Sequence, residues 1–521
     1  MIDTIGSRDQ RRGAAVVQER AVVIGAGVGG LAAALGLAAA GLPVTLLEAA
    51  PAPGGKMRRV PAGPLSVEAG PTVFTMRWVF EEIFAEAGAD LAARVRLAPA
   101  AILARHAWTA SERLDLFADP ARSEAAIADF AGPREADGFR QFRTRAAEIY
   151  RTLEKPFIRD FRPTPVDLAM RVGPWGLGDL WRIQPFVTLW TALCDTFRDP
   201  RLRQLFGRYA TYCGSSPFSA PATLMLVAHV ELDGVWTIEG GLSRLAQACA
   251  DLAAERGAEI RYGARVRRIV VEGGRVAGVD LDDGERLPAT RVVANADVAA
   301  LAAGLFGPDA ARAVDPVPAA ERSLSAITFA LAARPAGFPL VRHNVFFSDD
   351  YAREFADLAH GPPRDPTVYV CAQARGDDGP EPEGPEPLLC LVNAPARDGP
   401  ADPEEIARCH ATMTRRLSAC GLTLTEEART TTTPEDFARL FPATGGALYG
   451  RASHGWMASF RRPGARTRLP GLYLAGGSVH PGPGVPMAAQ SGRLAAASIL
   501  QDLASTRPSP RAATHGGTST G

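Results

Sequence analysis

The sequence predicts an α/β protein whose parallel sheet is assembled from segments that lie far apart in the chain. Three observations predict this fold class. A short apolar stretch, Ala21–Ile24, leads directly into a glycine-rich turn and an alanine-rich helix. Short strands separated by turn signals recur between residues 259 and 294, and another strand followed by a glycine turn and a helix begins at Gly471. Strands that alternate with helices are typical of parallel sheets covered by helices.

The composition is that of a folded globular protein. Of 521 residues, 46% are hydrophobic and 22% are charged, close to the averages for globular domains. The 57 basic residues balance the 57 acidic residues, so no net field draws the chain to nucleic acid, and we expect no nucleic-acid partner. The seven cysteines are odd in number and none is spaced C-x-x-C, so we expect neither a disulfide framework nor a metal site.

Residues 21–47 carry no charge and are long enough to span a bilayer, which needs about 20 residues. Six glycines and Pro43 interrupt this stretch, and each glycine costs about 1 kcal/mol against alanine in a helix interior. We therefore expect a strand, a turn, a helix and a second strand here. We expect no membrane-spanning anchor and no export signal.

The first strand, turn and helix carry a dinucleotide-binding pattern, because Gly25-Ala26-Gly27-Val28-Gly29-Gly30 matches G-x-G-x-x-G. Gly25 permits the tight turn, Gly27 lets the backbone approach a pyrophosphate, and Gly30 lets the helix pack close to the strand. The helix N-terminus offers free N–H groups to the phosphates. Glu48 ends the next strand, 18 residues beyond Gly30, where a carboxylate can accept hydrogen bonds from a ribose. The pattern predicts a Rossmann-like domain.

Further glycine-bearing elements follow at Pro53-Gly54-Gly55-Lys56-Met57 and at Glu68-Ala69-Gly70-Pro71-Thr72. A second block begins at Gly240-Gly241, which opens an amphipathic helix. Four short strands are predicted after it: Glu259–Tyr262, Val266–Val271, Gly274–Leu281 and Arg291–Ala294.

The last block reads as a buried strand that runs into the glycine turn Gly476-Gly477 and then a helix from Met487 to about Leu503. Pro486 is placed at the first helical position, where proline is best tolerated.

These motifs resemble those of the flavin-dependent amine oxidase and phytoene desaturase superfamily. The resemblance covers about residues 20–503 and implies an FAD-binding, Rossmann-like domain of the glutathione-reductase type, interleaved with a mixed α+β substrate domain and a helical region. It implies that FAD is the cofactor and that the following residues bind it: Gly25, Gly27, Gly30, Glu48, Gly55, Lys56, Gly70, Pro71, Thr72, Val266, Gly476, Gly477, Val485 and Met487.

The resemblance also implies where these residues lie on the cofactor. Gly55 and Lys56 belong near the diphosphate, the turn Gly70–Thr72 near the isoalloxazine, and the backbone of Val266 near the adenine. Members of the superfamily usually have arginine in place of Lys56, and lysine keeps the charge but lacks the bidentate fork. The N-terminus of the last helix could place its partial positive charge at the flavin edge where negative charge grows on reduction.

The same resemblance divides the chain into interleaved parts. The division is a disordered N-terminus (1–19), three FAD-binding parts (20–100, 235–300 and 465–503), a helical region that faces the substrate or the membrane (101–234), a substrate-binding α+β domain (301–464) and a disordered tail (504–521).

Four stretches resemble one branch in particular: Ser323–Ala326, Arg342–Tyr351, Gly445–Trp456 and His480–Met487. They are similar to the hydroxyneurosporene (methoxyneurosporene) desaturases of purple phototrophic bacteria. That branch introduces the 3,4 double bond into acyclic 1-hydroxy or 1-methoxy carotenoids during carotenoid biosynthesis. The resemblance therefore implies an oxidoreductase that acts on CH–CH groups, with an acyclic carotenoid as substrate.

The chemistry of desaturation needs a hydride acceptor and a proton acceptor. Side chains cannot accept a hydride, whereas a flavin can. Glu239 precedes Gly240-Gly241, where many phytoene desaturases have a basic residue, and its carboxylate could take the proton or offset a developing cation. A surface or helix-capping glutamate is the competing interpretation of Glu239.

An acyclic carotenoid is a long, apolar polyene that dissolves in a bilayer rather than in water. The segment Pro156–Trp190 mixes aromatic residues with arginines, a composition suited to a membrane interface. Interior helix packing explains the same aromatics about as well. We expect a cytoplasmic protein that associates peripherally with the inner or photosynthetic membrane.

Three alternatives stay open at this point. One is a phytoene desaturase or carotenoid isomerase of the same family, and another is a flavin oxidase of amines or porphyrinogens. The third is a prenyl-binding or lipid-binding escort protein on the same fold, against which the intact glycine pattern and its acid argue. The sequence does not indicate whether oxygen or a quinone accepts the electrons.

Overall fold

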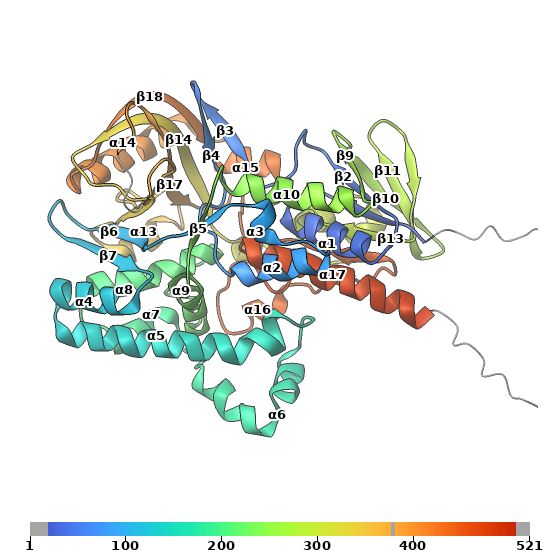
Figure 1. Ribbon diagram of the computed structural model, residues 1–521, viewed down its shortest axis with the longest axis horizontal. Helices are drawn as coiled ribbons and strands as arrows, with labels where there is room; N and C mark the ends of the chain where they lie inside the picture. Colours follow the sequence, from blue (N-terminus) through green and yellow to red (C-terminus); the bar gives the residue numbers. More distant parts are fainter. Residues whose placement is uncertain (1–18, 377–380, 507–521) are drawn as a thin grey trace, which may run out of the picture.

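The computed structural model describes residues 19–376 and 381–506. A parallel sheet with its helices lies on the right of Figure 1, a larger mixed sheet lies at the upper left, and a layer of helices runs along the lower side. The fold is α/β, as predicted, and the chain crosses between the two sheets several times.

The parallel sheet is built from three distant parts of the chain. Its strand order is β19-β13-β1-β2-β9, and every neighbouring pair is parallel. The strands are β1 (Ala21–Ile24), β2 (Val44–Glu48), β9 (Glu259–Tyr262), β13 (Arg291–Ala294) and β19 (Leu472–Leu474). β1 is buried along its whole length, as expected for a strand covered on both faces.

Helices cover one face of this sheet and a small antiparallel sheet covers the other. The helices are α1 (Val28–Ala39), α2 (Arg77–Glu86), α10 (Leu242–Glu255) and α17 (Val485–Thr506), and the small sheet consists of β10 (Val266–Glu272), β11 (Arg275–Leu281) and β12 (Arg286–Pro288). α1 and α17 cross closely, because a Cβ on Gly492 would lie 2.1 Å from the Gly29 carbonyl oxygen. The two glycine-led helices therefore pack backbone to backbone.

The mixed sheet has seven strands in the order β18-β14-β17-β16-β15-β6-β7. They are β6 (Ile102–Ala107), β7 (Arg113–Phe117), β14 (Ser325–Ala336), β15 (His343–Phe346), β16 (Val368–Ala372), β17 (Glu386–Ala394) and β18 (Thr423–Thr432). Only β15 and β6 pair in parallel. The helix α14 (Pro403–Ala419) covers one face, and the hairpin β3 (Arg59–Ala62) and β4 (Leu65–Glu68) packs on the other.

The structure differs in part from the helical region predicted at 101–234. The segments β6 and β7 lie inside that range and form one edge of the mixed sheet. In β7 burial alternates, with Leu114 and Leu116 buried between more exposed neighbours, which is the period of a half-buried strand. The hairpin is short, and the aromatic-rich helices that follow it dominate the sequence pattern.

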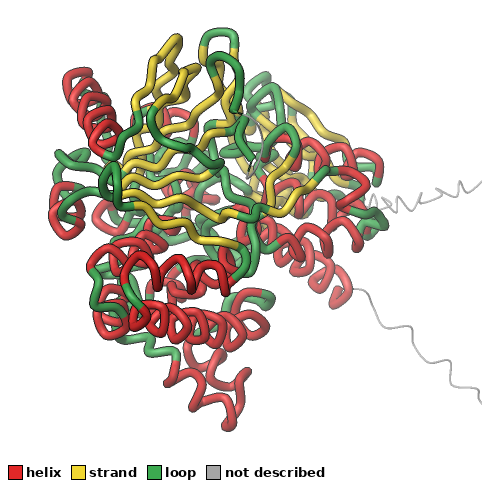
Figure 2. Tube along the Cα trace, turned by 60° about the vertical axis from the view of Figure 1, so that its left-hand side comes forward, coloured by secondary structure: helices red, strands yellow, loops and turns green. Residues whose placement is uncertain are grey.

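Residues 120–232 consist of helices and connecting loops. They form a separate layer below the mixed sheet, seen in red beneath the yellow strands in Figure 2. Its elements are α4 (Pro120–Ala131), α5 (Pro133–Leu153), the π-helical turn η1 (Glu154–Ile158), α6 (Pro165–Arg182), α7 (Leu189–Thr196), α8 (Pro200–Gly207), the 3₁₀ helices η2 (Arg208–Cys213) and η3 (Ala222–Leu224), and α9 (Met225–Leu232). Phe206 stacks on Phe197 at 5.0 Å and contacts Phe142 at 4.5 Å between ring centroids. This aromatic core fixes η2, which follows directly.

Shorter elements complete the fold. They are α3 (Leu91–Arg94), β5 (Leu97–Pro99), β8 (Trp236–Ile238), α11 (Val298–Ala302), α12 (Pro308–Ala311), η4 (Ala319–Glu321), α13 (Tyr351–Asp357), α15 (Pro434–Leu440) and α16 (Ala458–Arg461). α17 continues to Thr506, three residues past its predicted end. The predicted disordered termini lie mostly outside the described residues. Within the described ranges, no helix is both long and apolar enough to cross a membrane.

Candidate active site

The glycine turn between β1 and α1 leaves no room for side chains. Gly25 has a φ of 95°, which favours glycine. A Cβ on Gly30 would lie 2.0 Å from the Gly25 carbonyl oxygen, and one on Gly27 would lie 2.8 Å from the side-chain nitrogen of Asn295. The three glycines of the predicted fingerprint are therefore required by packing, and they lead into the N-terminus of α1, the kind of helix end that offers backbone N–H groups to anions.

Asn295, which follows β13, joins this turn to the second glycine turn. Its Nδ2 donates a hydrogen bond to the Gly25 carbonyl at 3.2 Å, and a Cβ on Gly476 would lie 3.0 Å from its Oδ1. The sequence predicts only that a strand ends just before Asn295. The one available signal was its place directly after a buried strand of the parallel sheet, because ligands bind at the carboxyl ends of such strands.

Glu48 lies beside the glycine turn. Its carboxylate accepts hydrogen bonds from the Ala26 N–H at 2.6 Å and from the Ala50 N–H at 2.7 Å. The Ala264 N–H donates to the backbone carbonyl of Glu48 at 2.8 Å, which brings the start of β10, including Val266, next to the same edge. The structure thus places the predicted ribose and adenine residues together.

The predicted diphosphate residues also approach the turn. A Cβ on Gly55 would lie 3.2 Å from the Cα of Gly27. The Lys56 ammonium donates to the Leu448 carbonyl at 2.5 Å and lies 5.0 Å from the centre of the Phe441 ring. Burial lowers the pKa of Lys56. Its engagement with the loop at Leu448 shows a packing role, and its phosphate contact stays a prediction.

The turn Gly70–Thr72 and the start of α17 lie in the wall of one cavity. A Cβ on Gly70 would come within 1.8 Å of the Lys56 carbonyl oxygen, so this position also excludes a side chain. Gly70, Pro71 and Thr72 line the cavity together with Val485 and Met487. The structure therefore brings the residues predicted near the isoalloxazine to a single place.

The second glycine turn is anchored from both sides. The Gly476 N–H donates to the Ser491 hydroxyl of α17 at 2.7 Å, and the Gly477 carbonyl accepts from the Arg462 guanidinium at 3.2 Å. The Ser478 hydroxyl accepts a hydrogen bond from the Val298 N–H at 3.2 Å. Its hydroxyl therefore orients α11 in this structure.

The cavity has a volume of about 470 Å³ and lies between the mixed sheet, the helical layer and the predicted flavin residues. Its walls are mainly apolar, as is common for small-molecule sites. Phe186 and Trp456 line the cavity and are also exposed, by 61% and 42%. The cavity therefore opens to the surface beside α6.

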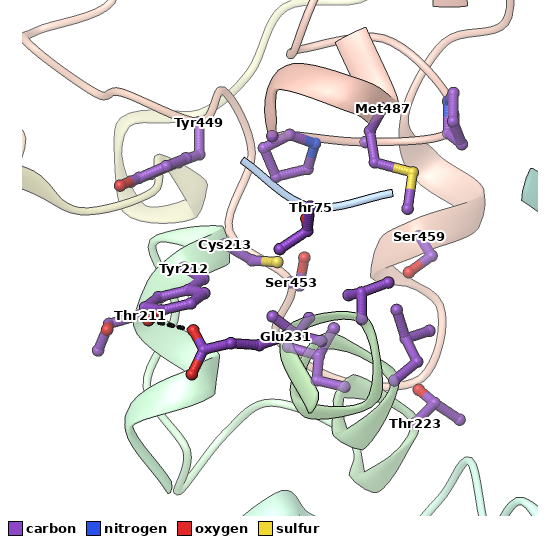
Figure 3. Close-up of a pocket in the computed structure, with 18 of the residues that line it drawn as sticks. Thr75, Thr211, Tyr212, Cys213, Thr223, Glu231, Tyr449, Ser453, Ser459 and Met487 are labelled. Carbon is purple, nitrogen blue, oxygen red and sulfur yellow. Dashed lines mark hydrogen bonds between the residues drawn. The ribbon is translucent and has the colours of Figure 1, made fainter. Parts of the chain in front are cut away.

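One side of the cavity is polar. The hydroxyls of Tyr209 and Tyr212 donate to the Glu231 carboxylate at 2.6 and 2.8 Å, and Arg208 donates to the Tyr212 hydroxyl at 2.7 Å. In Figure 3 Tyr212 and Glu231 meet on one side of the cavity, and Met487 lies on the other. Burial raises the pKa of Tyr212.

Glu239 is placed elsewhere. Its side chain is 68% exposed and pairs with Arg96 at 3.3 Å, outside the set of described residues that line the cavity. Its catalytic role stays a prediction, and its geometry is that of a surface ion pair. Among the described residues, the carboxylates that line the cavity are Glu231 and Glu354, which sequence reasoning missed.

Glu354 is buried and has three donors around it. Its carboxylate accepts from the Ser348 hydroxyl at 2.6 Å and from both the hydroxyl and the N–H of Thr367, at 2.7 and 3.1 Å. Burial raises the pKa of Glu354 to about 7, although the hydrogen bonds oppose this. It can therefore exchange a proton near neutral pH.

The chain was compared with known families and proteins. Residues 28–500 match the family described as flavin containing amine oxidoreductase. The hydroxyneurosporene desaturase of Rubrivivax gelatinosus is 55% identical over 509 residues, which cover 96% of this chain and 97% of that protein. The hydroxyneurosporene desaturase of Cereibacter sphaeroides is 49% identical over 491 residues, which cover 93% and 98%.

Solved structures resemble this fold at low sequence identity. An oxidoreductase from Methanosarcina mazei superposes with a TM-score of 0.57 and 18% identity, over 92% of this chain and 100% of that chain. A triple mutant of putrescine oxidase superposes with a TM-score of 0.59 and 14% identity, over 94% and 99%. These two likenesses concern the fold alone.

Proposed function

Because the chain belongs to the flavin containing amine oxidoreductase family, and within it to the carotenoid desaturases, we propose that it introduces the 3,4 double bond into acyclic 1-hydroxy and 1-methoxy carotenoids. FAD is the cofactor. The observation that carries the proposal is one apolar cavity that extends from Gly70–Thr72 and Met487, where the flavin ring is expected, to the surface at Phe186.

The residues present fit FAD. The two glycine turns exclude side chains where backbone must approach a ligand, and Asn295 holds the turns together. Glu48 would accept from the ribose, the N–H groups at the start of α1 would face the diphosphate, and the start of α17 would face the flavin ring. FAD bound there supplies the hydride acceptor that oxidation of a CH–CH bond requires.

The chain itself positions the substrate and handles the proton. The apolar walls exclude water and align the polyene along the cavity. Desaturation removes a hydride from one carbon and a proton from the neighbouring carbon. The proton must be accepted by a base in the same cavity. Glu354 has a pKa suited to this role, since burial raises it to about 7.

We also infer that the protein docks on a membrane through α6. This helix and the loop after it expose Val166, Met170, Trp181 and Phe186 by 67%, 67%, 76% and 61%. α6 is kinked at Gly173, and Arg171 lies before the kink and Arg182 after it, so both parts combine apolar residues with arginine, as interfacial helices do. Because Phe186 also lines the cavity, a carotenoid could pass from the bilayer into the cavity without crossing water.

The electrons removed from the carotenoid must finally reach an acceptor, and two acceptors are compatible with this function. A quinone dissolved in the same membrane is compatible with docking through α6, and oxygen is the alternative. Turnover in the absence of oxygen with an added quinone, compared with turnover in air, distinguishes the two.

The experiment that tests the function uses purified protein loaded with FAD in liposomes. Hydroxyneurosporene and phytoene are supplied separately, and the products are identified. We expect a new C3=C4 bond in hydroxyneurosporene and no change in phytoene. Desaturation of phytoene, or only isomerised products, would contradict the proposal in favour of another reaction of the same family. Failure to bind FAD would favour the escort-protein alternative.

A further inference from the structure

A buried ion pair lies on the polar side of the cavity wall. Arg208 of η2 and Glu231 of α9 approach to 3.6 Å, and their side chains are exposed by only 6% and 3%. Both line the cavity. Removing two charges from water is expensive, and such pairs often stabilise a fold no better than apolar residues of the same size. Stabilisation of the fold therefore does not by itself explain why this pair is buried here.

Arg208 keeps hydrogen-bond donors without partners. Its Nη1 donates to the Tyr212 hydroxyl at 2.7 Å. Its Nε and Nη2 are buried and make no hydrogen bond among the described residues, although Nη2 is the atom that lies 3.6 Å from the Glu231 carboxylate. The Tyr351 hydroxyl belongs to a residue that also lines the cavity, and it too is buried and has no hydrogen-bond partner among the described residues. Buried polar groups are nearly always paired, so unpaired donors in a cavity wall point to a ligand oxygen that completes them.

Glu231 can accept one more hydrogen bond beside Arg208. One of its oxygens accepts from Tyr209 and the other from Tyr212. Each carboxylate oxygen has two lone pairs, so capacity remains for another donor. The wall thus offers one donor and one acceptor close together, which is the complement of a hydroxyl group.

We propose that Arg208 and Glu231 form a subsite for the oxygen at C1 of the carotenoid, with Arg208 donating to that oxygen and Glu231 accepting the hydrogen of a C1 hydroxyl. This inference rests on the proposed function. A methoxy oxygen can accept from Arg208 but has no hydrogen to donate to Glu231. A carotenoid without oxygen at C1 leaves both groups unpaired, which a site of this kind strongly disfavours.

The subsite lies near the predicted flavin residues. Tyr212, which bridges Arg208 and Glu231, lines the same cavity as Thr72 and Tyr369, and these last two hydroxyls share a hydrogen bond at 2.7 Å. η2 runs from Arg208 to Cys213, and Cys213 also lines the cavity. In the substrate only C1 and C2 separate the oxygen from C3. A site that holds the oxygen therefore also selects which carbon–carbon bond is oxidised, as a positioning device.

The test measures selectivity by competition. FAD-loaded protein in liposomes receives equal amounts of hydroxyneurosporene, methoxyneurosporene and neurosporene, and the initial product ratios are determined. A hydrogen bond to a charged group accounts for a preference of about 10- to 100-fold. We expect Glu231→Gln to lower the preference for the hydroxy over the methoxy substrate about 10-fold. We expect the charge-neutral double variant Arg208→Met with Glu231→Gln to lower the preference for either over neurosporene by a further 10-fold or more.

A matched control removes a buried ion pair elsewhere. Arg375 and Glu386 are exposed by 8% and 1%, pair at 2.8 Å, and lie outside the described residues that line the cavity. The double variant Arg375→Met with Glu386→Gln should leave the product ratios unchanged. Equal ratios in the Arg208 and Glu231 variants and in the unchanged protein would overturn the subsite, and so would an equal shift in the control.

A further variant tests the subsite if the variants of Arg208 and Glu231 do not fold. Tyr212→Phe removes the hydroxyl that bridges Arg208 and Glu231 without removing a charge. Provided that it binds FAD normally, we expect it to reduce the preference for the hydroxy substrate severalfold, and an unchanged ratio would contradict the subsite. Failure of the unchanged protein to desaturate any of the three carotenoids contradicts the proposed function instead, so the two failures are distinguishable.

Discussion

Asn295 connects two turns that come from opposite ends of the chain. Its amide contacts Gly25 and Gly476, and the first of these is 270 residues away in sequence. The G-x-G-x-x-G run could be predicted because the pattern lies within six consecutive residues, although the side chain that crowds Gly27 belongs to Asn295. Asn295, Glu231 and Glu354 could not, because only tertiary packing gives these common residue types a partner or a place in the cavity wall.

Gly30→Ala should abolish or strongly weaken FAD binding. The added methyl group would meet the Gly25 carbonyl oxygen at 2.0 Å, so the turn would have to open. Gly36→Ala on the same helix is the control, because its methyl group would meet only the Ala496 methyl group, at 3.3 Å. Flavin fluorescence titration measures both affinities. Wild-type affinity in Gly30→Ala would show that the turn does not bind the cofactor.

Glu239→Gln should retain FAD and full turnover, because the Glu239 side chain is 68% exposed and pairs with Arg96 on the surface. Glu354→Gln should lower the maximal rate at least 10-fold if the buried carboxylate accepts the proton. Rates are measured in liposomes at saturating carotenoid. A large loss in Glu239→Gln with normal FAD content would support the predicted role of Glu239 as the base.

His480 should make the protein less stable in mild acid. Burial lowers its pKa to about 4, against about 6.5 in the unfolded chain. The folded state therefore keeps the ring neutral. As the pH falls from 6.5 towards 4, the unfolded chain takes up a proton that the folded chain does not, and stability decreases by up to about 1.4 kcal/mol per pH unit. Above pH 6.5 the effect vanishes.

The variant His480→Gln isolates this contribution. Between pH 7.5 and 5.5 its free energy of unfolding should decrease by roughly 1 kcal/mol less than that of the unchanged protein. Urea titrations at both pH values measure the difference. An identical pH dependence in the two proteins would mean that His480 is not held neutral by burial.

At the scale of elements, α6 and η2 perform different tasks around one cavity. α6 exposes apolar side chains beside the opening, and η2 carries Arg208 into the wall. The parallel strands were predictable within a few residues because each is short and is followed by a turn, although β9 is not apolar. The edge strands β6 and β7 were not, since β6 pairs with β15, more than 200 residues away, and no local pattern records that pairing.

The double variant Trp181→Glu with Phe186→Glu should lose membrane binding. Both side chains are largely exposed on one protrusion, and each would contribute about 2 kcal/mol if buried in lipid. Leu305→Glu is the control, because Leu305 is 47% exposed and lies far from α6 in sequence, between α11 and α12. Liposome flotation measures binding. Unchanged flotation of the double variant, or equal loss in the control, would contradict docking through α6.

At the scale of the whole molecule, the parallel sheet draws strands from three parts of the chain, and the mixed sheet fills the intervals between them. The predicted cofactor contacts come from all three parts. Bound FAD would therefore tie the segments together and stabilise the whole fold by mass action. The cavity exists only where the cofactor segments, the mixed sheet and the helical layer meet.

The most direct measurement is a single turnover without oxygen. FAD-loaded protein in liposomes is mixed with hydroxyneurosporene, and flavin absorbance and product are followed together. We predict that the yellow absorbance bleaches and that one new C3=C4 bond appears for each flavin reduced. Product formation without bleaching, or a folded protein that binds no FAD, would contradict the assignment of this cavity as the place where a flavin oxidises a carotenoid.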